Sequence, residues 1–221
     1  MHPAHGVGET MSALGALRGA IEGGNAAAAR AATEALIASG SGARPILDGA
    51  LLPAMAAVGV RFRDREIFLP DVLLAARAMK SSMRLLEPLL VRDSVPASGV
   101  VVIGTVRGDL HDIGKNLVSV MLQGAGYRVI DLGTDVEPDA FIDAALEADA
   151  SLIAVSALLT TTMTSMGELV ERVAERGLRD RLRILVGGAP VTEEFAREIG
   201  ADGYARDAVA AVARTAEMVG R

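Results

Sequence analysis

The fold is decided by residues 99–116, GVVVIGTVRGDLHDIGKN. This stretch opens with a short apolar run rich in β-branched residues, continues through a polar loop, and leads into an amphipathic segment from about Ile113 to Gly124. Apolar β-branched runs of this kind are typical of strands buried on both faces, and apolar residues at every third or fourth position are typical of a helix. These residues therefore predict a strand, a loop and a helix in succession.

The same succession is repeated to the C-terminus. Further β-branched runs lie at residues 128–132, 151–156 and 182–187, with a weaker candidate at Gly203-Tyr204, and amphipathic segments lie at 138–148, 163–177, 192–199 and 207–219. Buried strands that alternate with helices form parallel sheets with helices on both sides. Residues 99–221 are therefore predicted to be an α/β domain with a doubly wound, five-stranded parallel sheet.

The N-terminal part has a different pattern, because apolar residues recur at helical spacing throughout residues 10–91. We expect four helices, over 10–22, from Asn25 to about Gly40, from Pro45 to about Arg63 with a kink at Pro53, and from Pro70 to about 91. Such helices bury a common apolar seam in a four-helix bundle. Residues 92–98, RDSVPAS, have no apolar period and predict a linker between a helical domain, 10–91, and the α/β domain, 99–221.

Composition excludes several classes of function. The chain has no cysteine, which excludes disulfides, thiolate zinc sites, iron–sulfur clusters and cysteine nucleophiles, and which favours the cytoplasm. The net charge is −6 and no cluster of basic residues is present, so we do not expect a nucleic-acid partner. We expect no membrane span either, because the sequence lacks an uninterrupted apolar run of about 18 residues.

Ligands of doubly wound sheets bind beside the carboxyl ends of the strands. Three unusual loops are predicted to lie at that edge, TVRGDLHD at 105–112, ALLTTT at 157–162 and Gly187-Gly188-Ala189-Pro190. The first of them contains His111, the only histidine beyond the N-terminal residues 1–9. The three loops together predict that the functional site lies at the carboxyl ends of the strands.

Known phosphate sites do not match the first loop. Five residues separate Gly108 from Gly114, whereas four residues separate the corresponding glycines of a P-loop. Asn116 follows Lys115 at the position where a P-loop has serine or threonine. The dinucleotide fingerprint is also missing from this turn. A phosphate-accepting receiver domain has the same architecture, but the third strand ends in Ser156 where the acceptor aspartate is expected.

The remaining motif is Asp109-x-His111-x-x-Gly114. A neutral imidazole is a good ligand for a transition metal, and a carboxylate on its other ring nitrogen fixes the tautomer and raises the basicity. One histidine cannot hold a bare ion, so the metal would be held in a macrocycle, which leaves haem and a corrinoid as candidates. Haem favours a pocket between helices with aromatic walls, and aromatic residues make up only 3% of this chain.

The same loops resemble a known family. GTVRGDLHDIGKN (104–116), SALLTTTM (156–163), VGGAP (186–190) and GADGYARDA (200–208) look like the vitamin B12-binding domain of corrinoid methyltransferase proteins. RFRDREIFLPDVLLAARAMK (61–80) resembles the helical cap that precedes this domain in methyl carriers. The resemblance covers the chain from about residue 10 onward and implies a Rossmann-like, flavodoxin-like cobalamin-binding domain preceded by a four-helix cap.

The resemblance also implies a binding mode. Cobalamin, as methylcobalamin or a related corrinoid, would bind base-off and His-on, with its dimethylbenzimidazole displaced. His111 would be the cobalt ligand, and Asp109 would hydrogen-bond to His111. Thr162 matches a position at which relatives have a hydroxyl group that extends this aspartate–histidine pair into a longer hydrogen-bond relay. The implied cofactor-binding residues are Asp109, Leu110, His111, Asp112, Ile113, Gly114, Ser156, Leu158, Thr160, Thr162, Gly187 and Gly188.

Some of these residues have implied roles toward the nucleotide tail of the cofactor. Gly114 would leave room for the tail, and Gly187-Gly188 would let the backbone approach it. Ser156, Leu158 and Thr160 would line its pocket. Phe68 and Met79 of the cap would shield the upper face of the corrin ring, although packing within a helical bundle explains these two residues equally well.

The function implied by the resemblance is that of a methyl carrier, a component that has no catalytic side chain of its own and does not act alone as an enzyme. Its partners would be a substrate-specific methyltransferase and a second methyltransferase that delivers to tetrahydrofolate or coenzyme M, with a reductive activase as a further partner. The alternative is a cobalamin-dependent sensor or light-responsive regulator, which usually adds a DNA-binding head and a cap tryptophan, and this chain contains no tryptophan.

Overall fold

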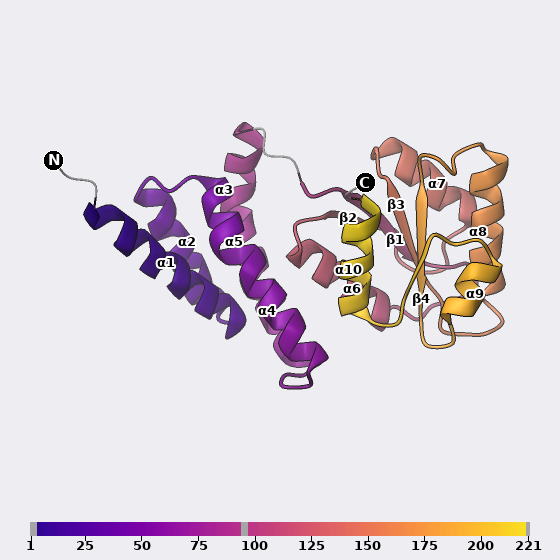
Figure 1. Ribbon diagram of the computed structural model, residues 1–221, viewed down its shortest axis with the longest axis horizontal. Helices are drawn as coiled ribbons and strands as arrows, with labels where there is room; N and C mark the ends of the chain where they lie inside the picture. The colour runs from indigo at the N-terminus through magenta and orange to yellow at the C-terminus, as the bar shows by residue number, and fades with distance from the viewer. Residues whose placement is uncertain (1–3, 94–96, 220–221) are drawn as a thin grey trace. The chain divides into compact units, whose positions relative to one another are not determined.

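The computed structural model describes residues 4–93 and 97–219, and the chain divides into two compact units, Met1–Pro96 and Ala97–Arg221 (Figure 1). Residues 94–96, in the middle of the expected linker 92–98, lie outside the described residues.

The first unit is helical. Its elements are α1 (Ala4–Glu22), α2 (Ala26–Ala38), α3 (Ala43–Ile46), the π-helical turn η1 (Leu47–Leu51), α4 (Leu52–Arg63) and α5 (Leu69–Arg92). The side chain of Asn25 accepts a hydrogen bond from the amide of Ala28 at 3.0 Å and so caps α2, as its position before an alanine run predicts. Leu17, Leu36 and Leu86 are completely buried among these helices and form part of the core of the bundle.

The third predicted helix differs in detail from the structure. Helical conformation begins at Ala43, two residues before Pro45, and includes the π-helical turn just ahead of Pro53. The amide of Leu52 donates to the carbonyl of Leu47, five residues back. Proline has no amide hydrogen to donate to the preceding turn, so the hydrogen-bond ladder of this continuous helix is interrupted at Pro53, directly after the π-helical turn.

One helical stretch among the described residues, Ala43–Arg63, is long and apolar enough to cross a membrane by length and composition. In this stretch the side chains of Ile46, Leu51 and Val58 are completely buried within the protein. Burial in the helical unit accounts for the apolar character of these positions.

The second unit has the fold class that the sequence predicts. Its strands are β1 (Val100–Thr105), β2 (Arg128–Asp131), β3 (Leu152–Ser156), β4 (Arg183–Gly187) and β5 (Gly203–Ala205), and its helices are α6 (Ile113–Gly124), α7 (Pro138–Glu147), α8 (Thr164–Glu175), α9 (Glu193–Glu198) and α10 (Ala208–Val219). The five strands are parallel and lie in the order β2-β1-β3-β4-β5. This is the doubly wound order of flavodoxin-like proteins.

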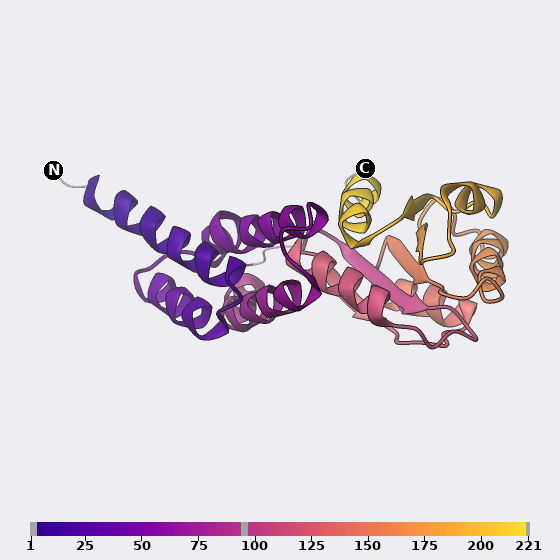
Figure 2. The same ribbon diagram turned by 90° about the horizontal axis from the view of Figure 1, so that it is seen from below.

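Helices cover both faces of this sheet (Figures 1 and 2). On one face Phe141 of α7 and Met166 of α8 pack against alternate strand residues such as Ile153. On the other face Leu122 of α6 and Ala211 of α10 pack against the intervening strand residues. Successive strand residues point to opposite faces, so the unbroken β-branched runs of the sequence are explained by burial on both sides.

The register of the strands aligns their carboxyl ends. Thr105 at the end of β1 pairs with Ser156 at the end of β3, and Ser156 pairs with Gly187 at the end of β4. The strand order reverses between β1 and β3, and loops leave the sheet in opposite directions at such a point and open a crevice between them. The loops after these strands therefore begin at one edge of the sheet.

An ion pair between the buried Lys115 and the partly exposed Asp131 connects the start of α6 to the end of β2. Lys115 is only 3% exposed, and its ammonium group donates to Asp131 Oδ1 at 2.6 Å and to Asn116 Oδ1 at 2.8 Å. A buried ammonium group without a counter-ion is costly, so this contact constrains the first turn of α6.

We expect Asp131→Asn to destabilise the second unit by roughly 2–3 kcal/mol, because the variant keeps the shape of the side chain but leaves the Lys115 ammonium buried without a counter-charge. Urea denaturation of the full chain measures the effect. The matched control is Asp149→Asn, which removes the partner of Arg181 from an exposed pair and is expected to leave the midpoint unchanged. Equal midpoints for the two variants would show that the pair of Lys115 and Asp131 contributes no more than a surface pair.

Candidate functional site

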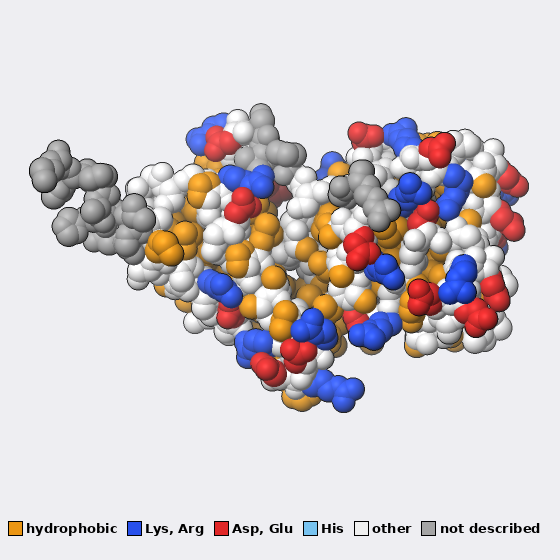
Figure 3. Space-filling view, in the orientation of Figure 1, with side chains coloured by type: hydrophobic (Ala, Val, Ile, Leu, Met, Phe, Trp, Pro, Cys, Tyr) orange, Lys and Arg blue, Asp and Glu red, His pale blue; other side chains and the backbone are white. Residues whose placement is uncertain are grey.

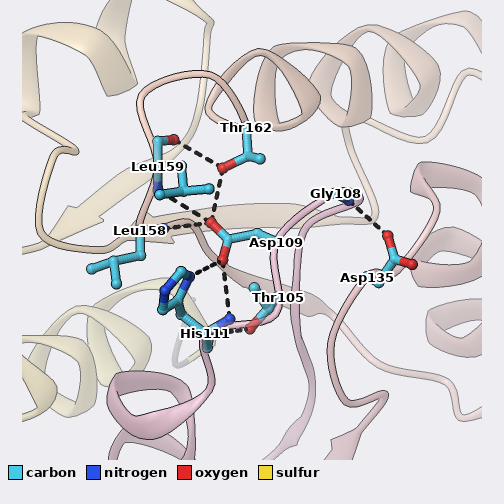
Figure 4. Close-up of polar contacts among 8 residues, drawn as sticks. All are labelled: Thr105, Gly108, Asp109, His111, Asp135, Leu158, Leu159 and Thr162. Atoms are coloured by element: carbon cyan, nitrogen blue, oxygen red, sulfur yellow. Dashed lines mark hydrogen bonds and ion pairs between the residues drawn. The ribbon is translucent and has the colours of Figure 1, made fainter.

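The central residues of the expected site lie on the loops that follow β1 and β3 (Figure 4). Asp109 and His111 belong to the segment between β1 and α6, and Leu158 and Thr162 belong to the segment between β3 and α8. The two segments are about fifty residues apart in sequence and meet at the carboxyl edge of the sheet.

The centre of the site is the carboxylate of Asp109, which is completely buried. Its Oδ1 accepts a hydrogen bond from the amide of His111 at 3.0 Å and lies 2.8 Å from His111 Nδ1. Its Oδ2 accepts from the amides of Leu158 and Leu159, at 2.7 and 3.2 Å, and from the hydroxyl of Thr162 at 2.8 Å. A buried carboxylate is tolerated when its lone pairs are occupied in this way.

These contacts determine the charge of Asp109. Burial acts to raise the pKa of Asp109, but hydrogen bonds from the amides of Leu158 and His111 and from the side chains of His111 and Thr162 outweigh it and hold the pKa well below its usual value. Asp109 is therefore ionised at neutral pH. An ionised carboxylate only accepts hydrogen bonds, so the nitrogen of His111 that faces it, Nδ1, carries a hydrogen.

The other ring nitrogen of His111 is left available. The side chain is 51% exposed, and no hydrogen bond to Nε2 is formed within the described part of the chain. The backbone is held as well, because the hydroxyl of Thr105 donates to the carbonyl of His111 at 3.0 Å. The site thus presents a fixed, exposed imidazole whose free nitrogen can bind a metal.

Large, exposed apolar side chains lie on the same two loops and at the start of α6. Leu110 and Ile113, on either side of His111 in the chain, are 73% and 74% exposed, and Leu158 and Leu159 are also exposed. Exposed apolar side chains on the same loops as an exposed imidazole are typical of a surface covered by a ligand. The face of a corrin ring, which is broad and largely apolar around a central metal, fits this composition.

The glycines of the expected site differ from one another. A Cβ added to Gly114 would meet no atom within 4 Å, so this position faces open space into which part of a ligand can extend. A Cβ at Gly188 would lie 1.9 Å from the carbonyl oxygen of Ala157, and one at Gly187 would lie 2.8 Å from that of Ala205. The packing of neighbouring backbone already requires glycine at 187 and 188, whether or not a ligand approaches them.

The remaining expected residues of the second unit lie near the same edge. Ser156 ends β3, and Thr160 is exposed in the loop that follows. Asp112 precedes α6 and accepts a hydrogen bond from the side chain of Asn116 at 2.9 Å. Their contact with a cofactor stays a prediction.

The two cap residues lie in the helical unit. Phe68, just before α5, is exposed, and its amide donates to Asp71 Oδ2 at 2.9 Å. Met79 is only 4% exposed and is part of the buried seam of α5. Bundle packing therefore accounts for Met79, whereas an exposed phenylalanine is free to cover a ligand. The shielding role of both residues stays a prediction.

Three contributors were not predicted from the sequence, namely Thr105, Leu159 and Asp135. Leu159 binds Asp109 through its backbone amide, so its side chain gives no signal in the sequence. Thr105 binds the carbonyl of His111, and Asp135 binds the amide of Gly108 at 2.7 Å. The available signal for these two was a short polar residue close to the end of an apolar run, directly after residues 99–104 for Thr105 and three residues beyond Leu132 for Asp135.

Comparison with known proteins identifies the family of this chain. Residues 99–213 match a family model described as B12 binding domain, and residues 14–87 match a second model with the same description. The chain is 44% identical over 174 residues to a corrinoid protein of Desulfitobacterium hafniense, with 77% of this chain and 81% of the relative covered. It is 47% identical over 174 residues to dimethylamine corrinoid protein 3 of Methanosarcina acetivorans, with 79% and 82% covered.

The chain belongs to the B12-binding corrinoid proteins of methyltransferase systems. As a corrinoid protein it binds cobalamin, which confirms the predicted cofactor. Solved structures agree with this family. A cobalamin-binding protein from Desulfitobacterium hafniense matches with a TM-score of 0.76 and 30% identity, over 93% of this chain and 98% of that one. The methanol:cobalamin methyltransferase complex of Methanosarcina barkeri matches with a TM-score of 0.84 and 28% identity, over 95% and 80%.

We expect Gly188→Ala to destabilise this corrinoid protein severely, because φ at this residue is +131° and the new Cβ would collide with the carbonyl of Ala157. Gly177→Ala is the matched control, since φ there is +66° but the added Cβ meets no atom within 4 Å. The control carries only the cost of left-handed backbone, about 1–2 kcal/mol. Thermal unfolding of the protein without cofactor should place Gly188→Ala clearly below the control, and equal melting temperatures would contradict the close contact.

Proposed function

We propose that this corrinoid protein carries a methyl group on cobalamin bound base-off and His-on, with His111 Nε2 as the lower ligand of the cobalt. When bound, the cofactor supplies a cobalt centre that takes a methyl group from a donor and gives it to an acceptor. The observation that supports the proposal is an exposed imidazole whose Nδ1 is held by a buried, ionised carboxylate while Nε2 is free.

The role of Asp109 in this proposal is to orient the ligand and to raise its basicity. The carboxylate holds the hydrogen on Nδ1, which leaves the lone pair on Nε2, and its negative charge increases the electron donation of the ring. Thr162 and the amides of Leu158 and Leu159 keep the carboxylate in place. The carboxylate, held in one position, in turn holds the imidazole in one orientation.

The nucleotide tail of the displaced base is assigned in this proposal to the space beside Gly114. That position is open, and the strand end at Ser156 lies at the same edge of the sheet. Leu158 and Thr160 are the further residues proposed for the walls of the tail pocket, and the exposed Phe68 is proposed to cover the upper face of the ring.

Partner enzymes are part of the proposal. Relatives are named dimethylamine corrinoid proteins, and one solved relative is a methanol:cobalamin methyltransferase complex. We propose that three partner enzymes act on this chain. A substrate-specific methyltransferase loads a methyl group onto it, and a second methyltransferase transfers that group to tetrahydrofolate or coenzyme M. A reductive activase restores the reduced cofactor. All three partners would be cytoplasmic. Acidic and basic side chains intermingle on the face shown in Figure 3.

The ligand role of His111 is tested with protein reconstituted with hydroxocobalamin and reduced to the cobalt(II) form. Electron paramagnetic resonance should show splitting by one axial nitrogen, and labelling the histidines with ¹⁵N should change that splitting from three lines to two. His111→Ala should abolish the change on labelling, while His5→Ala serves as the control and should keep it. Splitting that is insensitive to the label in the unsubstituted protein would mean that the benzimidazole remains on the cobalt.

The carrier role is tested by methylation of the reduced holoprotein. We expect the methylated form to appear only when a methyltransferase and a methylated amine or alcohol are both supplied, because a chain without cysteine cannot build a zinc–thiolate site that activates such a donor. Omitting either component is the control. A light-driven change in the oligomeric state of the adenosylcobalamin complex, together with no methylation by any partner, would favour a regulator instead.

A further inference from the structure

The segment after β2 runs alongside the segment that carries Asp109. The amide of Thr105 donates to the carbonyl of Gly133 at 2.9 Å, and the amide of Val136 donates to the carbonyl of Thr105 at 3.0 Å. Val106 and Val136 then form an isolated parallel bridge. Residues 133–136 therefore extend the pairing of β1 and β2 beyond the ends of the two strands.

Asp135 in this segment makes two reciprocal contacts with the loop of Asp109. Its Oδ1 accepts a hydrogen bond from the amide of Gly108 at 2.7 Å, and its own amide donates to the carbonyl of Asp109 at 3.0 Å. Figure 4 shows Asp135 approaching Gly108 on the side of Asp109 away from Leu158 and Leu159. The carboxylate of Asp109 is thus fixed by one loop and its backbone by another.

The backbone in both places is in an uncommon conformation. Gly108 has φ of +80° and Asp135 has φ of +56°, and both values lie in the left-handed region. Aspartate tolerates this region better than most residues, at a cost that other contacts must offset. The two hydrogen bonds of Asp135 supply such contacts at the point where the loop turns toward Asp109.

A second connection fixes the same loop to the helices behind it. The guanidinium of Arg107 donates to Glu137 at 2.9 Å and to Glu168 of α8 at 2.6 Å. Both pairs are partly exposed, so each adds little to stability by itself. They hold the side chain of Arg107 against Glu137 and Glu168, whereas Asp135 contacts the backbone of Asp109 directly.

We propose that Asp135 is a positioning residue for the metal ligand, because its hydrogen bond to the amide of Gly108 holds the loop in the shape that sets Asp109 against His111 Nδ1. The inference rests on the proposed function of His111 as the cobalt ligand. Asp135 acts through Gly108 and Asp109, so its effect is on the orientation of the imidazole.

Two substitutions separate the hydrogen bond from the charge and from the backbone conformation. Asp135→Asn removes the charge but keeps an acceptor oxygen and tolerance of positive φ. Asp135→Gly keeps the main-chain amide and accepts positive φ without strain, but has no acceptor for Gly108. Asp135→Ser, whose shorter side chain cannot place an oxygen at the same point, takes the place of Asp135→Gly if that variant does not fold.

The first measurement uses the protein without cofactor. Nitrogen NMR of ¹⁵N-histidine protein reports which ring nitrogen of His111 carries the hydrogen. The unsubstituted protein and Asp135→Asn should show a single tautomer protonated at Nδ1, and Asp135→Gly should show a mixture. This measurement does not depend on cobalt ligation. It therefore tests the role of Asp135 even if His111 is not the cobalt ligand.

The second measurement is the ratio of His-bound to His-free cobalt(II) in reconstituted protein, obtained from the ¹⁵N-sensitive splitting. Asp135→Gly should lower this ratio about fivefold, which is the typical effect of one lost hydrogen bond, and Asp135→Asn should stay within about twofold of the unsubstituted protein. Absence of label-sensitive splitting in the unsubstituted protein would contradict the ligand role itself, independently of any substitution at position 135.

Two outcomes would overturn the role of Asp135. In the first, Asp135→Gly has the same tautomer and the same ratio as the unsubstituted protein, which would show that the hydrogen bond to Gly108 does not orient the imidazole. In the second, Asp135→Asn behaves like Asp135→Gly, which would show that the charge of the carboxylate is responsible and not its acceptor oxygen.

Discussion

The site depends on one buried charge, the carboxylate of Asp109. A carboxylate removed from water without partners costs several kcal/mol, and here donors from two loops replace the lost water. His111 supplies its backbone amide and its ring to one oxygen, and Leu158, Leu159 and Thr162 supply the donors to the other. The same interactions that make the burial tolerable also join the two loops and aim the imidazole, so stability and ligand geometry have a common origin.

The sheet makes this meeting of loops possible. Because β1 and β3 are adjacent and in register at Thr105 and Ser156, the segments that follow them start side by side. The position of β2 on the other side of β1 brings Asp135 to the opposite flank of the Asp109 loop. The loop is therefore supported from both neighbouring strands, and its end at His111 is fixed to the sheet by Thr105.

Sequence patterns predicted most of the elements and only part of the site. The α6 helix, Ile113–Gly124, was predicted with the bounds that the structure has, because helical periodicity and a terminal glycine are local signals. The π-helical turn before Pro53 was not predicted, since the proline indicated only that the helix is disturbed. The pairing of Lys115 with Asp131 and the contacts of Asp135 also escaped prediction, because each joins groups on different elements.

The sequence by itself determined the alternation of strands and helices, the absence of cysteine chemistry, and the Asp109-x-His111-x-x-Gly114 motif with its resemblance to corrinoid proteins. These are properties of residue type and short spacing. Only the tertiary structure decided that Asp109 is completely buried and ionised, that Gly188 is required by the carbonyl of Ala157, and that Asp135 supports the loop. The reason is that burial, steric collision and hydrogen bonding depend on which segments of the backbone the strand order brings together. That order cannot be inferred from any single stretch of the sequence.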